Sequence, residues 1–248
     1  MELSVDPALV TGFVLGLVRA SAWVFVAPPF STRAIPIRVK VGLAAALALA
    51  AAPRVGEEPL PLDTASFVGA LVLQVAVGLA LGFLTLMLVS AVQAAGSLVD
   101  LFGGYSIATV YDPLADASAA VFGRFYQLLA VTLLFALDAH LLLVRGFLAS
   151  FEAVPTSGLD LGDLNRVLTR DLGVFFAAAI EVAAPVLAVL FVAEIAMGLL
   201  ARAAPQMNVF ALGFSVRVVV ALLLVGVSIP LLVPALENLV GRAVSGVG

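Results

Sequence analysis

The chain of 248 residues contains no cysteine and only one histidine. Without cysteine it has neither a disulfide nor a thiolate metal site, and one histidine supplies no histidine cluster for a metal. Charged residues make up 11% of the chain, against about 25% in soluble domains. The Lys and Arg residues form no basic patch and no Walker A loop occurs, so the sequence indicates neither a nucleic-acid-binding protein nor a nucleotide hydrolase.

Apolar residues dominate instead, at 63% of the chain with a mean hydropathy of +1.22. Soluble domains are about 45–50% apolar, so the composition indicates an integral membrane protein. The longest uncharged run covers residues 64–99. As one helix it would rise roughly 54 Å, whereas the hydrocarbon core of a bilayer is about 30 Å thick. Part of this run must therefore project, bend or pack inside protein.

Hydrophobic residues gather in six blocks that lack the alternation typical of barrel strands. The blocks cover residues 8–26, 41–52, 66–95, 121–144, 172–200 and 209–236. The second block, which stops before Pro53, is short for a span and closer to a buried or re-entrant segment. The predicted fold class is an all-α integral membrane protein with about six hydrophobic helical segments that form helical hairpins. Because Lys and Arg are shared almost evenly between alternate connections, the positive-inside rule gives no orientation.

Among the charged residues inside the hydrophobic blocks, four need most explanation, namely Arg19, Glu181, Glu194 and Arg217. A charge near the bilayer centre costs at least ~2.5–3.5 kcal/mol on insertion scales, so each of these side chains needs a partner or water. One interpretation is ion pairing between helices or between subunits, and the other is a polar conduit. The sequence favours structural pairing without deciding the question.

Two weaker patterns also lie in or beside the blocks. His140 is two residues from Asp138, and this pair is interpreted as marking a helix end in preference to chemistry. The pairs Gly12/Gly16 and Gly78/Gly82 would let helices approach closely. With 21 glycines in the chain, ordinary membrane composition explains such pairs equally well.

The connection over residues 103–121 is the most unusual one. It begins with two glycines and contains an Asp-Pro step that resists helix formation. Irregular backbone is not tolerated against lipid, because its polar groups would lack hydrogen bonds. The segment is therefore either an ordinary loop outside the membrane or a segment that lines or blocks a pore, and the residues alone slightly favour the first.

Several of these stretches, taken in order, resemble one known family. They are PPF from Pro28, IPIRVKVGLA from Ile35, QAAG from Gln93 before Asp100, GYSIATVYDP from Gly104, and GLLARAAPQMNVFALGF from Gly198. Arg19, His140-Leu141 and the stretch from Ser150-Phe151 to Pro155 fit the same pattern. In order and spacing, the chain resembles the FliR family of flagellar export-gate proteins, which is related to the SctT family of virulence secretion systems.

The resemblance implies a single membrane-embedded export-gate domain over residues 1–248. Residues 1–171 would form a part similar to FliP, and residues 172–248 a C-terminal hairpin similar to FliQ. In this family much of the helical assembly stands above the bilayer plane, which would account for the overlong third block. The loop after that block is a plug in the export channel, and here it corresponds to residues 104–121.

The resemblance also implies two sets of functional residues. The plug or gate loop would use backbone freedom, apolar surface and a helix stop, supplied by Gly103, Gly104, Tyr105, Ser106, Ile107, Val110, Tyr111, Asp112 and Pro113. The turn between the last two helices would contact another subunit through Arg202, Pro205, Gln206, Met207, Asn208 and Phe210.

The implied function is a non-enzymatic subunit of the flagellar type III export gate in the bacterial inner membrane, within the flagellar basal body. Its partners would be FliP-like and FliQ-like subunits, together with FlhB-like and FlhA-like components, and its substrates unfolded exported proteins. Neither a cofactor nor a metal is expected. The equivalent virulence-type gate subunit stays open as an alternative, with a small-solute secondary transporter as a distant one, because such a transporter would show internal repeats and a midplane site.

Overall fold

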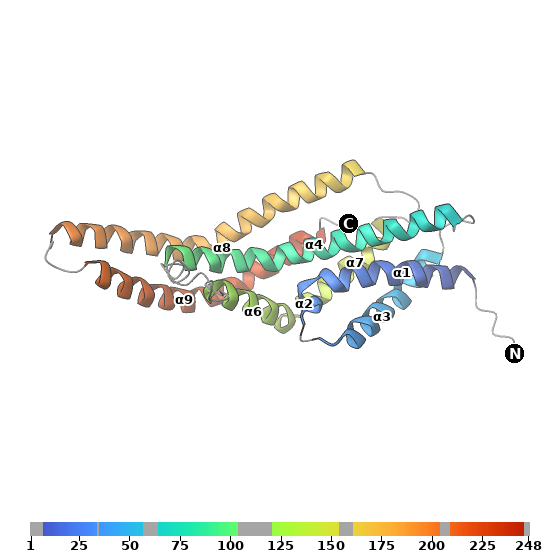
Figure 1. The fold of residues 1–248 in the computed structure, drawn as a ribbon, viewed down its shortest axis with the longest axis horizontal. Helices are drawn as coiled ribbons and strands as arrows, with labels where there is room; N and C mark the ends of the chain where they lie inside the picture. The colour runs from blue at the N-terminus through green and yellow to red at the C-terminus, as the bar shows by residue number, and fades with distance from the viewer. Residues whose placement is uncertain are drawn as a thin grey trace, which may run out of the picture. The chain divides into compact units, whose positions relative to one another are not determined.

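The computed structural model describes residues 7–33, 35–56, 64–103, 121–153, 161–203 and 209–245, and every regular element in these ranges is a helix (Figure 1). The predicted all-α class is therefore confirmed. In chain order the helices are α1 (Pro7–Val26), α2 (Pro28–Ser31), α3 (Ile37–Gly56), α4 (Thr64–Phe102), α6 (Val121–Ala136), α7 (Ala139–Ala153), α8 (Leu161–Ala203) and α9 (Val209–Ser245).

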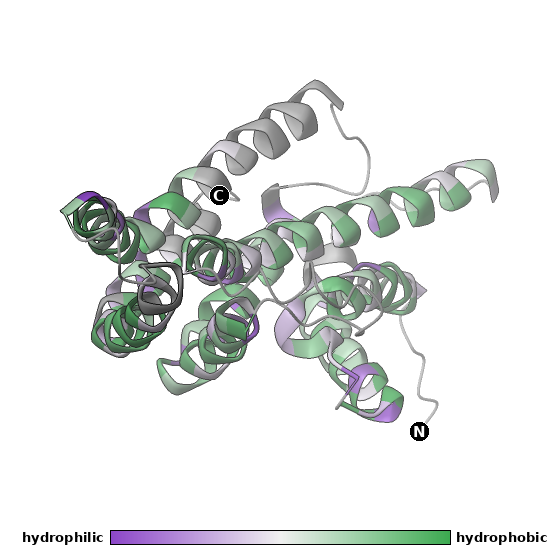
Figure 2. Ribbon diagram, turned by 60° about the vertical axis from the view of Figure 1, so that its left-hand side comes forward, coloured by the Kyte–Doolittle hydropathy of each residue, from purple (hydrophilic) through white to green (hydrophobic). Residues whose placement is uncertain are grey.

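The uncharged run predicted from the sequence lies in α4, one continuous helix of 39 residues. At about 1.5 Å per residue it is roughly 58 Å long, about twice the hydrocarbon thickness of a bilayer. Three described segments are long and apolar enough to cross a membrane, Pro7–Val26, Thr64–Phe102 and Ala179–Ala203. Bent helix pairs raise the possible number to five. Figure 2 shows apolar residues along most of the described helices, as a membrane protein requires.

Three helix boundaries differ from the hydrophobic blocks. Helix α3 continues past Pro53 to Gly56, although the block stopped before this proline. The fourth block is divided between α6 and α7 by a two-residue turn, in which Asp138 has a φ of 53°. Helix α8 begins at Leu161, within the connection between the fourth and fifth blocks. Hydropathy misses these boundaries because it records how apolar a segment is and not where its backbone turns.

The chain divides into two compact units. The first unit comprises residues 1–88, 137–172 and 240–248, and the second comprises residues 89–136 and 173–239. The predicted division into a FliP-like part and a FliQ-like hairpin concerns likeness to other proteins and stays a prediction.

In the first unit, α1 packs along α3, and Figure 1 shows the two helices side by side. A Cβ added to Gly16 would lie 3.4 Å from the Cα of Ala48, so the two helices meet through small residues. Helix α4 approaches α1 still more closely, because a Cβ on Gly78 would lie within 2.4 Å of the Arg19 carbonyl oxygen. A Cβ on Gly82 would lie 2.7 Å from the Val26 Cβ. These glycines therefore form helix contacts and are not merely membrane composition.

An aromatic cluster closes the core of the first unit. Trp23 is 1% exposed and stacks on Phe147 of α7, with ring centroids 4.8 Å apart. Phe30 of α2 lies against the same indole at 5.3 Å, and Phe151 meets Phe147 edge-on at 5.4 Å. The indole Nε1 donates a hydrogen bond to Thr85 Oγ1 of α4 at 3.3 Å. This cluster fixes α1, α2, α4 and α7 around the buried side chain of Arg19.

In the second unit, α6 packs on the C-terminal part of α4, and α8 and α9 run side by side in opposite directions (Figure 1). The Met197 Cε of α8 lies 3.5 Å from the position of a Cβ on Gly213 of α9, which brings the two helices together near their connection. Tyr126 of α6 and Ser228 of α9 share a buried hydrogen bond of 2.6 Å between Oη and Oγ.

Candidate functional site

Arg19 of α1 is completely buried in the first unit. Its Nε donates a hydrogen bond of 2.6 Å to Gln74 Oε1 of α4. Its Nη1 donates to the Ser150 carbonyl oxygen of α7 at 2.8 Å and to the Ser150 Oγ at 3.2 Å. The guanidinium also lies 4.0 Å from the ring centroid of Phe151. One cation thus ties together three helices that are far apart in the sequence.

The surroundings of Arg19 explain how a charge is tolerated inside an apolar chain. Burial of an unpaired ion costs several kcal/mol, and hydrogen bonds together with an aromatic face offset that cost. Arginine suits this role because its planar fork donates in several fixed directions. The sequence singled out Arg19 but not its aromatic partner, which is Phe151.

Gln74 and Ser150 are functional candidates that sequence reasoning missed. Gln74 is completely buried, and its Nε2 has no hydrogen-bond partner among the described residues. The signal available was a polar amide within an otherwise apolar run, which is costly unless it is hydrogen-bonded. Ser150 is 1% exposed and its Oγ also donates to the Phe147 carbonyl at 2.6 Å. Because Gln74 and Ser150 lie on other helices, sequence spacing alone does not pair either of them with Arg19.

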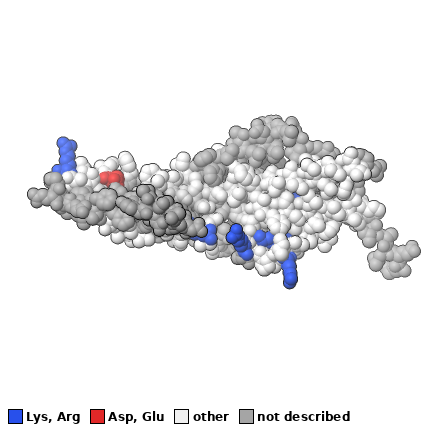
Figure 3. Space-filling view, in the orientation of Figure 1, with Lys and Arg blue, Asp and Glu red and all other residues white. Residues whose placement is uncertain are grey.

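The other charges inside the hydrophobic blocks lie elsewhere. Glu181 and Glu194 are exposed on α8 of the chain by itself, so only a further molecule could bury them. The side chain of Arg217 lies outside the described part of the structure. The predicted pairing of these charges between subunits therefore stays a prediction. Figure 3 shows how sparse charged side chains are on one face of the described residues.

Most of the two residue sets implied by the resemblance fall outside the described residues. Residues 104–120, which include the predicted plug from Gly104 to Pro113, are not described, and neither are residues 204–208 of the predicted turn. Gly103 is buried at the end of α4, where its N–H donates to the Val99 carbonyl at 2.7 Å. Arg202 is exposed in the last turn of α8, and Phe210 belongs to the first turn of α9.

Asp138 and His140 lie at a helix end, as the sequence indicated. Asp138 is exposed in the turn before α7, and its carbonyl oxygen accepts a hydrogen bond from the Leu141 N–H at 2.9 Å. A left-handed φ is several-fold enriched for Asp over most residues. His140 is half-buried in the first turn of α7.

A second buried polar cluster, at the end of α4, was not assigned a role by the sequence. Asp100 is 3% exposed, and its carboxylate accepts two backbone hydrogen bonds from the start of α6. The Phe122 N–H donates to Oδ1 at 3.0 Å and the Gly123 N–H donates to Oδ2 at 2.8 Å. Together they satisfy two of the N–H groups that a helix leaves unpaired at its beginning.

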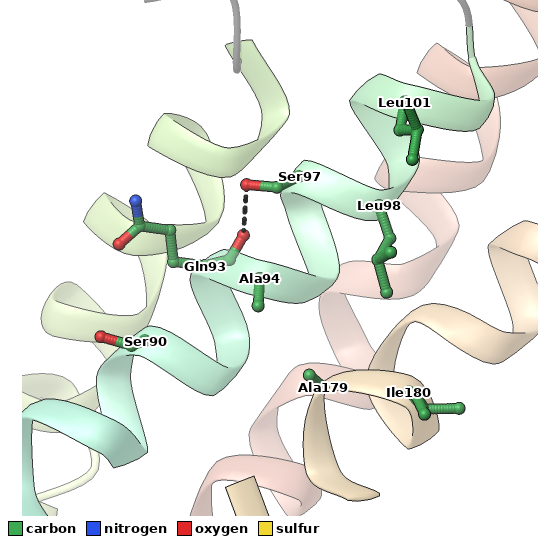
Figure 4. A pocket seen from close by; sticks show the side chains of 8 residues that line it. All are labelled: Ser90, Gln93, Ala94, Ser97, Leu98, Leu101, Ala179 and Ile180. Carbon is green, nitrogen blue, oxygen red and sulfur yellow. Dashed lines mark hydrogen bonds between the residues drawn. The ribbon is translucent and has the colours of Figure 1, made fainter. Parts of the chain in front are cut away.

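Described residues of the second unit also line two cavities. The larger, of about 720 Å³, is an open groove between α4 and α8. Its lining in Figure 4 combines Leu98, Leu101 and Ile180 with the polar residues Ser90, Gln93 and Ser97. The Ser97 Oγ donates back to the Gln93 carbonyl at 3.2 Å, so this hydroxyl is satisfied within α4.

The smaller cavity, of about 280 Å³, lies between α8 and α9. Prolines interrupt both helices beside it, Pro185 in α8 and Pro234 in α9. Glu181, Ser228 and Asn238 give it polar walls. The described residues contain no group of three His, Cys, Asp or Glu that could hold a metal.

Comparison with known proteins assigns the chain to a family. The family model described as bacterial export proteins, family 1, matches residues 10–243. The chain is 32% identical over 231 residues to the flagellar biosynthetic protein FliR of Pectobacterium carotovorum subsp. carotovorum, which covers 93% of this chain and 88% of the relative.

Two further relatives carry the same name. The FliR of Escherichia coli (strain K12) is 32% identical over 224 residues, which covers 90% of this chain and 86% of the relative. The FliR of Bacillus subtilis (strain 168) is 31% identical over 235 residues, which covers 93% of this chain and 90% of the relative. With similarity this extensive from residue 10 to residue 243, the chain belongs to the FliR family of bacterial export proteins.

Proposed function

We propose that this chain is a subunit of the export gate of the flagellar type III protein secretion apparatus, in the bacterial inner membrane. It completes and closes a channel through which unfolded proteins leave the cell. The observation that carries this proposal is the match of the export-protein family over residues 10–243. Apolar membrane-capable helices and large exposed apolar side chains support a membrane subunit that joins a larger assembly.

The exposed surface of α8 supports contact with other subunits. Phe191, Val192 and Leu199 are 65%, 64% and 65% exposed on the chain alone. Lipid could cover these apolar side chains, but it could not pair the carboxylate of Glu181 on the same helix. Glu181 makes no hydrogen bond or ion pair with the residues that the structure describes. A cationic side chain of a neighbouring subunit would satisfy this carboxylate at membrane depth.

The subunits that would cover this surface are FliP-like and FliQ-like proteins, with FlhB-like and FlhA-like components bound to the completed gate. Co-expression with the FliP-like and FliQ-like proteins should give one complex that contains this chain after purification in mild detergent. The chain expressed alone should aggregate, because its exposed apolar surface then lacks protein partners. A monodisperse, stable chain without partners would contradict the proposal.

The segment of residues 104–121 acts as the plug of the channel in this proposal. Deletion of residues 106–117 should leave the complex assembled but make the membrane permeable to ions. The measurement is the conductance of membranes that contain the complete gate with and without the deletion. An assembled deletion variant as tight as the parent would refute the plug.

The alternative within the family is the gate of a virulence-type secretion system. All three relatives compared above carry a flagellar name, which favours the flagellar system. In a host cell from which the gene for this chain has been deleted, the chain should therefore restore swimming. Restored secretion of virulence substrates without swimming would reverse this choice.

A further inference from the structure

The cap formed by Asp100 joins two helices across the segment proposed as the plug. Helix α4 ends at Phe102 and α6 begins at Val121, so Asp100 lies just before residues 104–120 and its partners lie just after them. The carboxylate accepts the Phe122 and Gly123 N–H groups at 3.0 and 2.8 Å. A helix is usually capped by the residue directly before it, whereas here the acceptor comes from 22 residues away.

Gly96 makes this cap possible. It lies one turn before Asp100, on the same face of α4. A Cβ on Gly96 would lie 2.5 Å from the Phe122 carbonyl oxygen and 2.9 Å from the Gly123 Cα. The α6 backbone therefore rests directly on α4, and any larger residue at position 96 would push it away from the carboxylate.

The Asp100 carboxylate and the first N–H groups of α6 stabilise each other. The first N–H groups of a helix have no acceptor within the helix and carry a partial positive charge. A carboxylate satisfies two of them at once and is itself relieved of the cost of burial by these two charge-assisted bonds. Since Asp100 is 3% exposed, water cannot easily replace either side of this contact.

We propose that Asp100, supported by Gly96, is the positioning residue that holds the two ends of residues 104–120 together. The proposal rests on the plug function proposed above for this segment. A plug must begin and end at fixed points if it is to return to the same closed position after each substrate. The cap provides such fixed points, because it ties the end of α4 to the beginning of α6 without a covalent bond.

The test uses the complete gate with Asp100→Asn in this subunit. Asparagine keeps one oxygen acceptor but turns an NH₂ group toward a backbone N–H, so one of the two bonds is lost. We expect the Phe122 and Gly123 amides to exchange hydrogen about 10-fold faster or more, as loss of a buried acceptor implies. We also expect an ion leak while the complex stays assembled. The matched control is Asp138→Asn, which removes the same charge at an exposed turn and should change neither measurement.

Gly96→Ala should weaken the same cap in a different way, since the added Cβ displaces α6 and leaves the carboxylate intact. Its control is Gly69→Ala in the same helix, where no atom lies within 4 Å of the added Cβ. Faster exchange and leakage in both test variants would support the positioning role. Failure of both variants to assemble would overturn it, because the cap would then serve assembly and not the position of the plug.

The deletion of residues 106–117 separates this inference from the proposed function. If the deletion leaks while an assembled Asp100→Asn gate stays tight, the positioning role is wrong and the plug stands. If the deletion itself stays tight, the plug is refuted and the positioning role falls with it. Unchanged amide exchange in Asp100→Asn would overturn the cap directly, whatever the conductance shows.

Discussion

Replacement of Arg19 by leucine tests the buried cluster of the first unit. The change removes the donor to Gln74 Oε1 and to the Ser150 carbonyl oxygen, at 2.6 and 2.8 Å. A buried polar group left without its partner costs about 1–3 kcal/mol, so two acceptors cost roughly 2–6 kcal/mol. Loss of the contact with Phe151 adds to this, and relief from burying a charge subtracts from it. We expect a net destabilisation of about 2–4 kcal/mol, within the range that those costs allow.

The assay is the thermal stability of the purified complex, together with the amount of this chain that enters it. Arg19→Lys should have an intermediate effect, because lysine keeps the charge but lacks the planar fork of donors. The control is Arg124→Leu, which removes an exposed arginine whose Nη1 donates to Gln127 Oε1 at 3.0 Å. An exposed contact of this kind contributes little, so the control should change stability by about 1 kcal/mol or less.

A double variant shows whether the loss comes from the unpaired amide. Gln74→Leu alone should destabilise the protein, because it takes away an acceptor of Arg19. In the Arg19→Leu background the same change should cost less or even stabilise the protein, because no orphaned amide remains. The coupling between the two positions should be about 1–3 kcal/mol. Additive effects, or an Arg19→Leu complex as stable as the parent, would refute the role given to this hydrogen-bond network.

Two further predictions follow from particular contacts, and a third follows from the family resemblance. Gly78→Ala should destabilise the protein by about 1–3 kcal/mol through overpacking against α1, measured by thermal denaturation of the complex, while Gly69→Ala should be neutral or slightly stabilising. Tyr126→Phe and Ser228→Ala should each lower the melting temperature, and their combination should cost less than the sum of the two, since both break one buried bond; strict additivity would count against that bond. A photo-crosslinker at position 206 should capture a neighbouring subunit, and capture of lipid or solvent alone would reject the subunit contact proposed for that turn.

Composition and hydropathy were sufficient to predict much of the fold. A chain with so few charges and such long apolar runs can satisfy its backbone in a membrane only as helices, once alternating strands are excluded. The predicted blocks therefore lie in α1, α3, α4, α8 and α9 and in the pair of α6 and α7. What hydropathy could not supply was the break at Asp138, because a single residue in a left-handed conformation barely changes a hydropathy average.

The sequence by itself determined the family and the all-α membrane class. It also predicted that Arg19 needs a partner, since a charge in an apolar block is costly wherever the helix docks. Only the tertiary structure decided which residues offset that cost. The partners of Arg19 lie 55 and 131 residues away, at Gln74 and Ser150. The same holds for Gly78 and for Asp100, which look like ordinary residues until a neighbouring backbone is placed against them. Local composition fixes how much apolar surface a helix carries, but hydrogen-bond partners and close backbone contacts depend on which helix faces meet.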